Sequence, residues 1–108
     1  MTKYERAALV QVNKIRKAER RKALKRLPPG HPNNGRLCPL AKALDGGKVK
    51  VGYHFLDVPV KKLPAYRKAG LELCYVDSGS AQFTPPKSFG TFMAWFDAQK
   101  GRAKELAL

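Results

Sequence analysis

The chain has 108 residues, which suffices for one folded domain and is too short for two. Its 44% hydrophobic content excludes wholesale disorder, the lack of an apolar run of roughly 18 residues excludes a membrane span, and two cysteines exclude a disulfide framework. Lysine and arginine total 22 against 8 acidic side chains, and this net charge of +14 indicates an anionic partner.

The amino-terminal segment carries the densest positive charge. Residues 1–27 hold ten basic and two acidic side chains and contain neither glycine nor proline, so we expect one helix from Thr2 to about Leu27. Beyond Ile15 the apolar face of this helix disappears, so its outer half should project or fray while residues 28–108 form a small α+β core. The face expected to pack comprises Tyr4, Ala8, Gln11, Val12 and Ile15.

The middle of the chain predicts a loop, a short helix and a strand. Residues 28–37 contain three prolines and two glycines, which is typical of a linker or irregular loop. Pro39 is well placed in the first turn of a short helix over residues 38–44. Alternation of apolar and polar residues over 49–55 predicts a half-buried strand.

Shorter elements follow toward the carboxyl end. Prolines bracket a turn or short helix over residues 60–68, and alternation predicts a strand over 71–76 and a short third strand over 81–84. Pro85 and Pro86 open a last helix whose apolar spacing predicts a buried face. That face comprises Phe89, Phe92, Met93 and Phe96.

These elements predict a small single domain of the α+β class. It would consist of a long basic amino-terminal helix, a short Cys-Pro helix, an antiparallel sheet of two or three strands and a carboxy-terminal helix. The expected core residues are Tyr4, Val12, Ile15, Leu40, Leu44, Val51, Tyr53, Leu73, Phe92 and Phe96.

Three motifs occur in a fixed order along residues 27–97. They read LPPGxP from Leu27, CPxAxAL from Cys38, and PPxxxxxFxxxFD from Pro85 to Asp97. This arrangement resembles small uncharacterised proteins encoded by actinobacteria and their phages. The resemblance implies such an origin and a shared core, and it carries no activity or binding residue over to this chain. The basic segment before Leu27 lies outside it.

The basic segment predicts contact with the phosphate backbone of nucleic acid. Lysine and arginine release condensed counterions from a duplex, and arginine also forks onto phosphate oxygens. We expect a non-enzymatic accessory protein that binds double-stranded DNA with little sequence preference, because no helix-turn-helix or zinc finger is recognisable. The candidate binding residues are Lys14, Arg16, Lys17, Arg20, Arg21, Lys22, Lys25 and Arg26.

Other interpretations of the same segment stay open. It could be a solvated surface helix, or the docking element of a phage effector that binds an acidic host protein. Its apolar face is too small for a membrane-surface helix, so no membrane partner is expected. A third alternative is a dimer in which Tyr4, Val12 and Ile15 pair between two copies, and the oligomeric state is otherwise open.

Metal, cofactor and enzyme chemistry are not expected. His31, Cys38, His54 and Cys74 have the composition of a zinc site but are spaced too widely, so both cysteines are interpreted as partly buried free thiols. No nucleophile-elbow or phosphate-loop motif is present. The aromatic residues of the last helix are expected in the core rather than on a base-stacking surface. Tyr53 and Phe55 are also expected in the core, with base stacking as a nearer alternative. Without the apolar run of a secretory signal, we expect a cytoplasmic protein.

Overall fold

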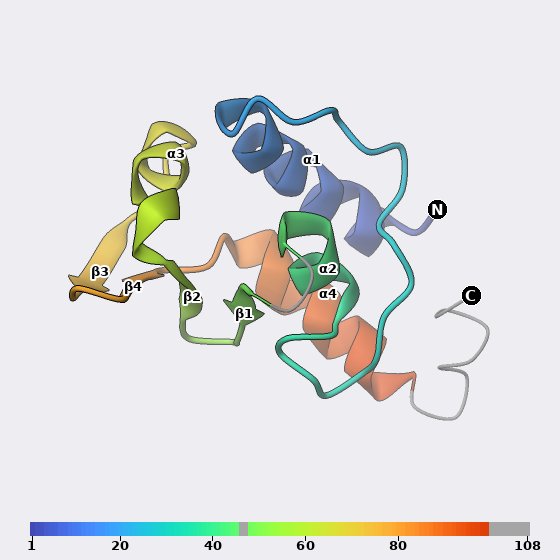
Figure 1. The fold of residues 1–108 in the computed structure, drawn as a ribbon. Helices are drawn as coiled ribbons and strands as arrows, with labels where there is room; N and C mark the ends of the chain where they lie inside the picture. Colours follow the sequence, from blue (N-terminus) through green and yellow to red (C-terminus); the bar gives the residue numbers. More distant parts are fainter. Residues whose placement is uncertain (46–47, 100–108) are drawn as a thin grey trace.

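The described part of the chain folds into four α-helices, one 3-10 turn and a four-stranded sheet (Figure 1). The computed structural model describes residues 1–45 and 48–99. This architecture confirms the predicted α+β class. The elements are α1 (Lys3–Ala18), α2 (Pro39–Asp45), β1 (Lys50–Val51), β2 (Leu56–Pro59), η1 (Val60–Lys62), α3 (Leu63–Lys68), β3 (Leu73–Val76), β4 (Ser80–Phe83) and α4 (Lys87–Ala98).

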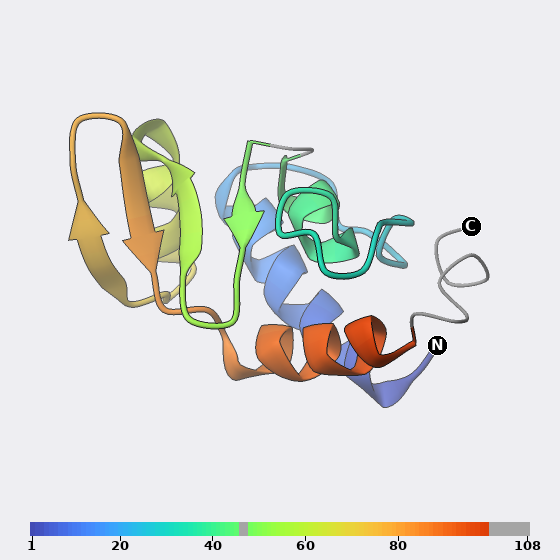
Figure 2. The same ribbon diagram turned by 90° about the horizontal axis from the view of Figure 1, so that it is seen from below.

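The sheet is antiparallel throughout, with the strand order β1-β2-β4-β3. One row of paired residues, running from Val51 through Leu56 and Phe83 to Leu73, lies on the inner face. Helix α3 covers the part of this face formed by β2, β4 and β3 (Figures 1 and 2), and its buried Tyr66 packs against Phe83 with ring centroids 5.6 Å apart. The alternation of strand residues therefore supplies one apolar face, as the sequence pattern requires.

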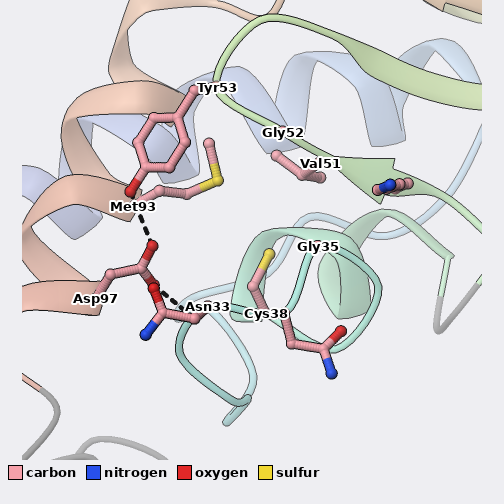
Figure 3. A pocket seen from close by; sticks show the side chains of 10 residues that line it. Asn33, Gly35, Cys38, Val51, Gly52, Tyr53, Met93 and Asp97 are labelled. Carbon is pink, nitrogen blue, oxygen red and sulfur yellow. Dashed lines mark hydrogen bonds between the residues drawn. The ribbon is translucent and has the colours of Figure 1, made fainter.

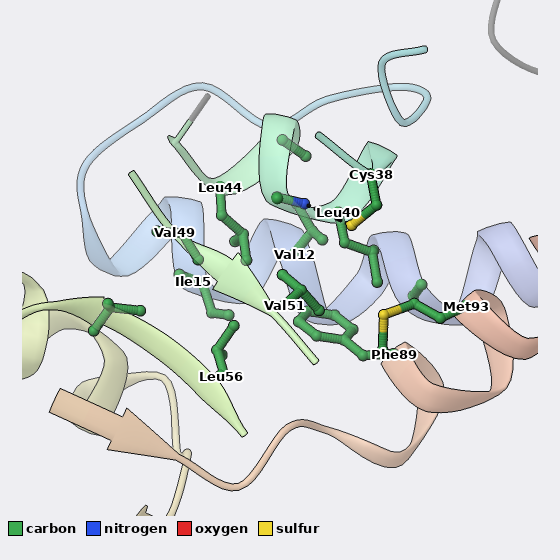
Figure 4. Packing of buried hydrophobic residues seen from close by; sticks show 14 of the residues in the cluster. Val12, Ile15, Cys38, Leu40, Leu44, Val49, Val51, Leu56, Phe89 and Met93 are labelled. Atoms are coloured by element: carbon green, nitrogen blue, oxygen red, sulfur yellow. Dashed lines mark hydrogen bonds between the residues drawn. The ribbon is translucent and has the colours of Figure 1, made fainter. Parts of the chain in front are cut away.

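The main core lies between α1, α2, α4 and the first two strands (Figure 4). Val12 and Ile15 of α1 are fully buried against Leu40 and Leu44 of α2. On the other side α1 packs along α4, where Tyr4 stacks on Trp95 at 5.8 Å. The predicted packing face of α1 and the predicted core face of α4 are confirmed.

The prediction of one helix to Leu27 is wrong, because α1 ends at Ala18. Arg20 adopts the left-handed conformation (φ 59°), and the amides of Arg20 and Arg21 return to the carbonyls of Lys17 and Arg16, which is a Schellman ending. Asn13 then holds the backbone of Leu24 through two hydrogen bonds of 2.9 and 3.0 Å.

Residues 19–27 therefore fold back over the rest of the domain and do not project into solvent (Figure 1). The buried carboxylate of Glu5 accepts a hydrogen bond of 3.2 Å from the backbone amide of Leu27. The side chains of Leu24 and Leu27 pack against the core. These long-range bonds outweigh the helix propensity of the segment, which is a weak local preference. The prediction of a projecting outer half is also wrong.

The predicted strand over residues 49–55 is interrupted. The chain reverses after β1, where the amide of Gly52 donates to the carbonyl of Phe55 at 2.9 Å, so four strands form instead of two or three. Tyr53 and Phe55 are each 52% exposed, so the placement of Tyr53 in the core is wrong. Two other expected core residues, Tyr4 and Leu73, are only partly buried. Residues 100–108 of the predicted core lie outside the described residues.

Candidate nucleic-acid interface

Two of the eight predicted binding residues bind the end of α2. Arg16 donates from Nε to the carbonyl of Lys22 and from Nη1 to the carbonyl of Ala43, both at 2.8 Å, and Arg21 donates to the carbonyl of Leu44. Ala43 and Leu44 belong to the last turn of α2, whose carbonyls lack partners within the helix and attract positive charge. Arg16 and Arg21 therefore cap α2. Burial and the nearby charge of Arg21 lower the pKa of Arg16.

A group of ion pairs surrounds this cap. Glu19 lies 3.5 Å from Arg21 and 2.6 Å from Lys62, and Lys62 also lies 3.2 Å from Asp45. Glu19 is only 11% exposed. Glu19, the single acid among residues 15–26, therefore joins the end of α1 to η1 and, through Lys62, to α2. It also neutralises part of the positive charge that was expected to bind an anionic partner.

Arg26 is held by a carboxylate of α1. Its guanidinium donates to both oxygens of Glu5, at 3.0 and 3.3 Å, and this pairing raises the pKa of Arg26. The Arg26 side chain is 66% exposed, so one of its faces is still open to solvent. Because Glu5 also binds Leu27, the pair fixes the end of the returning segment.

The other five predicted residues are exposed. The side chains of Lys14, Lys17, Arg20, Lys22 and Lys25 make no hydrogen bond or ion pair within residues 1–45 and 48–99. Three of them, Lys14, Lys17 and Arg20, line a groove of about 610 Å³ together with Lys68 at the end of α3. Lys22 and Lys25 lie on the returning segment and do not line this groove.

The groove continues along α1 toward its amino terminus. Its next section passes Lys14, Gly70 and Lys87, and a further section is bounded by Lys87 and Lys3. These are three separate hollows, and each shares lining residues with the next, including Lys14 and then Lys87, so together they form a discontinuous track along α1. We call this track the basic groove and define it by its cations, which are Lys3, Lys14, Lys17, Arg20, Lys68 and Lys87.

The charge balance of the basic groove is strongly positive. Among the residues that line it the acid is Glu72, which accepts a hydrogen bond from Thr84. None of the six cations pairs with a carboxylate of a described residue. From Lys3 to Lys17 the groove follows 14 residues of helix, about 21 Å at 1.5 Å per residue. The arrangement suits an extended anion.

Three of the six cations of the basic groove were not among the binding residues predicted from the sequence. Lys3 lies 11 and 14 residues before Lys14 and Lys17, and at 100° per residue these three fall on one face, so helical periodicity could have identified it. Lys68 and Lys87 belong to α3 and α4, and the tertiary fold places them beside α1. No local pattern connects either of them to α1.

The strained backbone of Arg20 gives a test of its role. We expect Arg20→Gly to raise the free energy of unfolding by about 0.5–1 kcal/mol, because glycine adopts the left-handed conformation without a Cβ clash. The same variant loses one cation of the basic groove and should bind a duplex about tenfold more weakly near 50 mM salt. Denaturant unfolding and a binding titration check both effects.

Arg20→Ala is the matched control, because it removes the charge and keeps the strain. Its affinity should equal that of Arg20→Gly while its stability stays near that of the parent. A parental affinity in both variants would exclude Arg20 from the interface.

The residues considered for other chemistry lie apart. Within the described ranges, no group of three or more His, Cys, Asp or Glu residues could hold a metal ion. Cys38 is buried, which raises the pKa of its thiol, whereas Cys74 is exposed, so the expectation of a partly buried Cys74 is wrong. Val12 and Ile15 are buried within one chain and cannot pair between two copies.

No helix among residues 1–45 and 48–99 combines the length and apolar character needed to cross a membrane. Comparisons with protein-family models, curated proteins and solved structures found no match to this chain.

Proposed function

We propose that this protein is a non-enzymatic nucleic-acid-binding accessory protein that holds a phosphate backbone in the basic groove. The observation that carries the proposal is the row of six cations that pair with no carboxylate of residues 1–45 and 48–99 and face one acid among the lining residues. A surface that only keeps a protein in solution usually mixes charges of both signs. A cytoplasmic location and an actinobacterial or phage origin are part of the proposal.

The dimensions of the basic groove suit a polynucleotide. The strands of a DNA duplex carry phosphates at short and regular intervals, so about 21 Å of groove can contact several of them at once. The six cations provide for several such contacts. Double-stranded DNA is the favoured ligand.

Little sequence preference is expected. Lysine contacts phosphate as a point charge, and phosphate contacts position a protein without reading bases. In addition, Arg16 and Arg21, which could have reached base edges, are bound to the carbonyls of α2. Contacts from the basic groove are therefore directed at the backbone.

Binding of a labelled duplex over a salt series tests this function. Five to six phosphate contacts predict a slope of log K against log salt concentration of about −4.5 to −5.5, with micromolar-class affinity at physiological salt. Absence of binding at tens of micromolar in low salt would exclude the proposal, as would a slope shallower than about −2.

A competition experiment separates nucleic acid from an acidic protein partner. Polyglutamate at equal charge concentration mimics an acidic surface and should displace the duplex poorly, because its carboxylates lack the regular phosphate spacing. Displacement as efficient as that by unlabelled duplex would instead assign the basic groove to an acidic protein.

A further inference from the structure

A second pocket lies at the other end of α4, at the meeting point of three chain segments (Figure 3). It has a volume of about 280 Å³, and none of its lining residues lines the basic groove. The loop before α2 contributes Asn33 and Asn34, the β1–β2 turn contributes Tyr53, and α4 contributes Met93 and Asp97.

Asp97 holds the walls of this pocket in place. Its two carboxylate oxygens accept hydrogen bonds from the hydroxyl of Tyr53 and from the backbone amide of Asn33, both at 2.8 Å (Figure 3). Partial burial and this hydrogen bond raise the pKa of Tyr53 to about 12, so the hydroxyl stays protonated at neutral pH. The Tyr53 ring is thus fixed while 52% of the residue is exposed.

The lining combines an apolar floor with free amide groups. Val51, Cys38 and Met93 are buried and form the floor. The side-chain amide of Asn33 and the Nδ2 group of Asn34 make no hydrogen bond to any described residue. Amides of this kind can recognise the donors and acceptors of a planar heterocycle.

A cation completes the set. Lys50 lines the pocket, is exposed and pairs with no carboxylate in the described part of the chain. The pocket thus offers a fixed aromatic ring, the side-chain amide of Asn33, the Nδ2 group of Asn34, an apolar floor and a lysine. These groups match the parts of a nucleotide, which are a stacking face, a polar edge and a phosphate.

We propose that this pocket binds an unpaired nucleobase, which stacks on Tyr53 and is hydrogen-bonded by Asn33 and Asn34 while Lys50 contacts its phosphate. The proposal rests on the proposed function in taking nucleic acid as the ligand, but it uses different residues. A base within a duplex is already stacked and paired, so the pocket favours a single strand, a frayed end or a free nucleotide. We call it the base pocket.

Two single strands of equal charge test the base pocket. One is an oligonucleotide of about eight residues, and the other is its abasic counterpart, which keeps every phosphate. We expect the normal strand to bind about tenfold more tightly in fluorescence anisotropy, since the abasic strand lacks the base that stacks on Tyr53. Tyr53→Ala should reduce this affinity to the abasic level and leave duplex binding unchanged.

Asn33→Gly is a second variant that tests the base pocket if Tyr53→Ala does not fold. Asn33 lies at φ 56°, which glycine adopts freely, and the backbone bond to Asp97 is retained. This variant should fold normally and lose part of the preference for the normal strand. Tyr53→Phe keeps the ring and should retain most of that preference.

A mixture of mononucleotides distinguishes the two sources of a base. Saturable shifts of the Asn33 and Asn34 side-chain signals, with equal affinities for the normal and abasic strands, would assign the pocket to a free nucleotide. Equal affinities without such shifts would overturn the base pocket. Duplex binding is measured separately. If the proposed function of the basic groove is wrong, the protein will not bind the duplex, and the comparison of the normal and abasic strands still tests the base pocket.

Discussion

Exchanging Lys14 and Lys17 together for glutamate lowers the affinity for a DNA duplex by on the order of 100-fold at about 50 mM salt. Both residues are exposed, make no ion pair among the described residues and line the basic groove. Each lost phosphate contact forgoes the release of about 0.9 counterion, so the slope of log K against log salt concentration also falls by about 2 units. Anisotropy titrations over a salt series measure both quantities.

Lys48 and Lys61 provide the matched control for this charge reversal. They are exposed and lie outside the basic groove, and their exchange for glutamate changes the net charge by the same amount. We expect this control to lose only a few-fold in affinity through the general field of the protein. If the two double variants weaken binding equally, net charge rather than the basic groove determines affinity, and the proposed site is wrong.

Replacement of Gly30 by alanine should lower the free energy of unfolding by about 3 kcal/mol or more, at the upper end of the range for overpacked sites. Gly30 is buried, and a Cβ placed on it would lie 2.5 Å from the carbonyl oxygen of Leu37 and from the nitrogen of Pro39. Both atoms belong to the backbone, so no side chain can rotate away. Thermal or denaturant unfolding gives the magnitude, with a decrease in Tm of roughly 12 °C or more.

Gly90→Ala is the control for this substitution. Gly90 lies within α4, and its added Cβ would meet no atom within 4 Å. Alanine should therefore stabilise the protein by up to about 1 kcal/mol, because it favours the helix and reduces the freedom of the unfolded chain. Equal stability of the Gly30→Ala variant and the parent would show that the loop before α2 does not pack as closely as described.

The elements with strong local patterns could be predicted from the sequence. Pro39 in a first turn and the spacing of Phe89, Phe92 and Phe96 indicate α2 and α4 because each pattern describes the element and its buried face together. The end of α1 could not be predicted in the same way. The side chains of Asn13 and Glu5 hold the backbone 11 and 22 residues later, and such bonds depend on the tertiary fold.

Only part of the candidate site could be predicted from the sequence, for the same reason. Positive charge alone does not distinguish Lys17, which is exposed, from Arg16, which caps α2 through the carbonyl of Ala43. The distinction depends on where α2 lies against α1. Tyr53 shows the converse case, since an alternating pattern placed it in a strand while the turn after Gly52 exposes its ring.

Mapping of amide chemical shifts during titration with a short DNA duplex in low salt tests the central claim most directly. The basic groove predicts that the largest changes occur at residues 14–20, 68–72 and 87–88, and that they diminish together as salt is added. Small changes are expected at residues 48–50 and 60–62. Changes concentrated in those two segments, or no change at tens of micromolar duplex, would contradict the account.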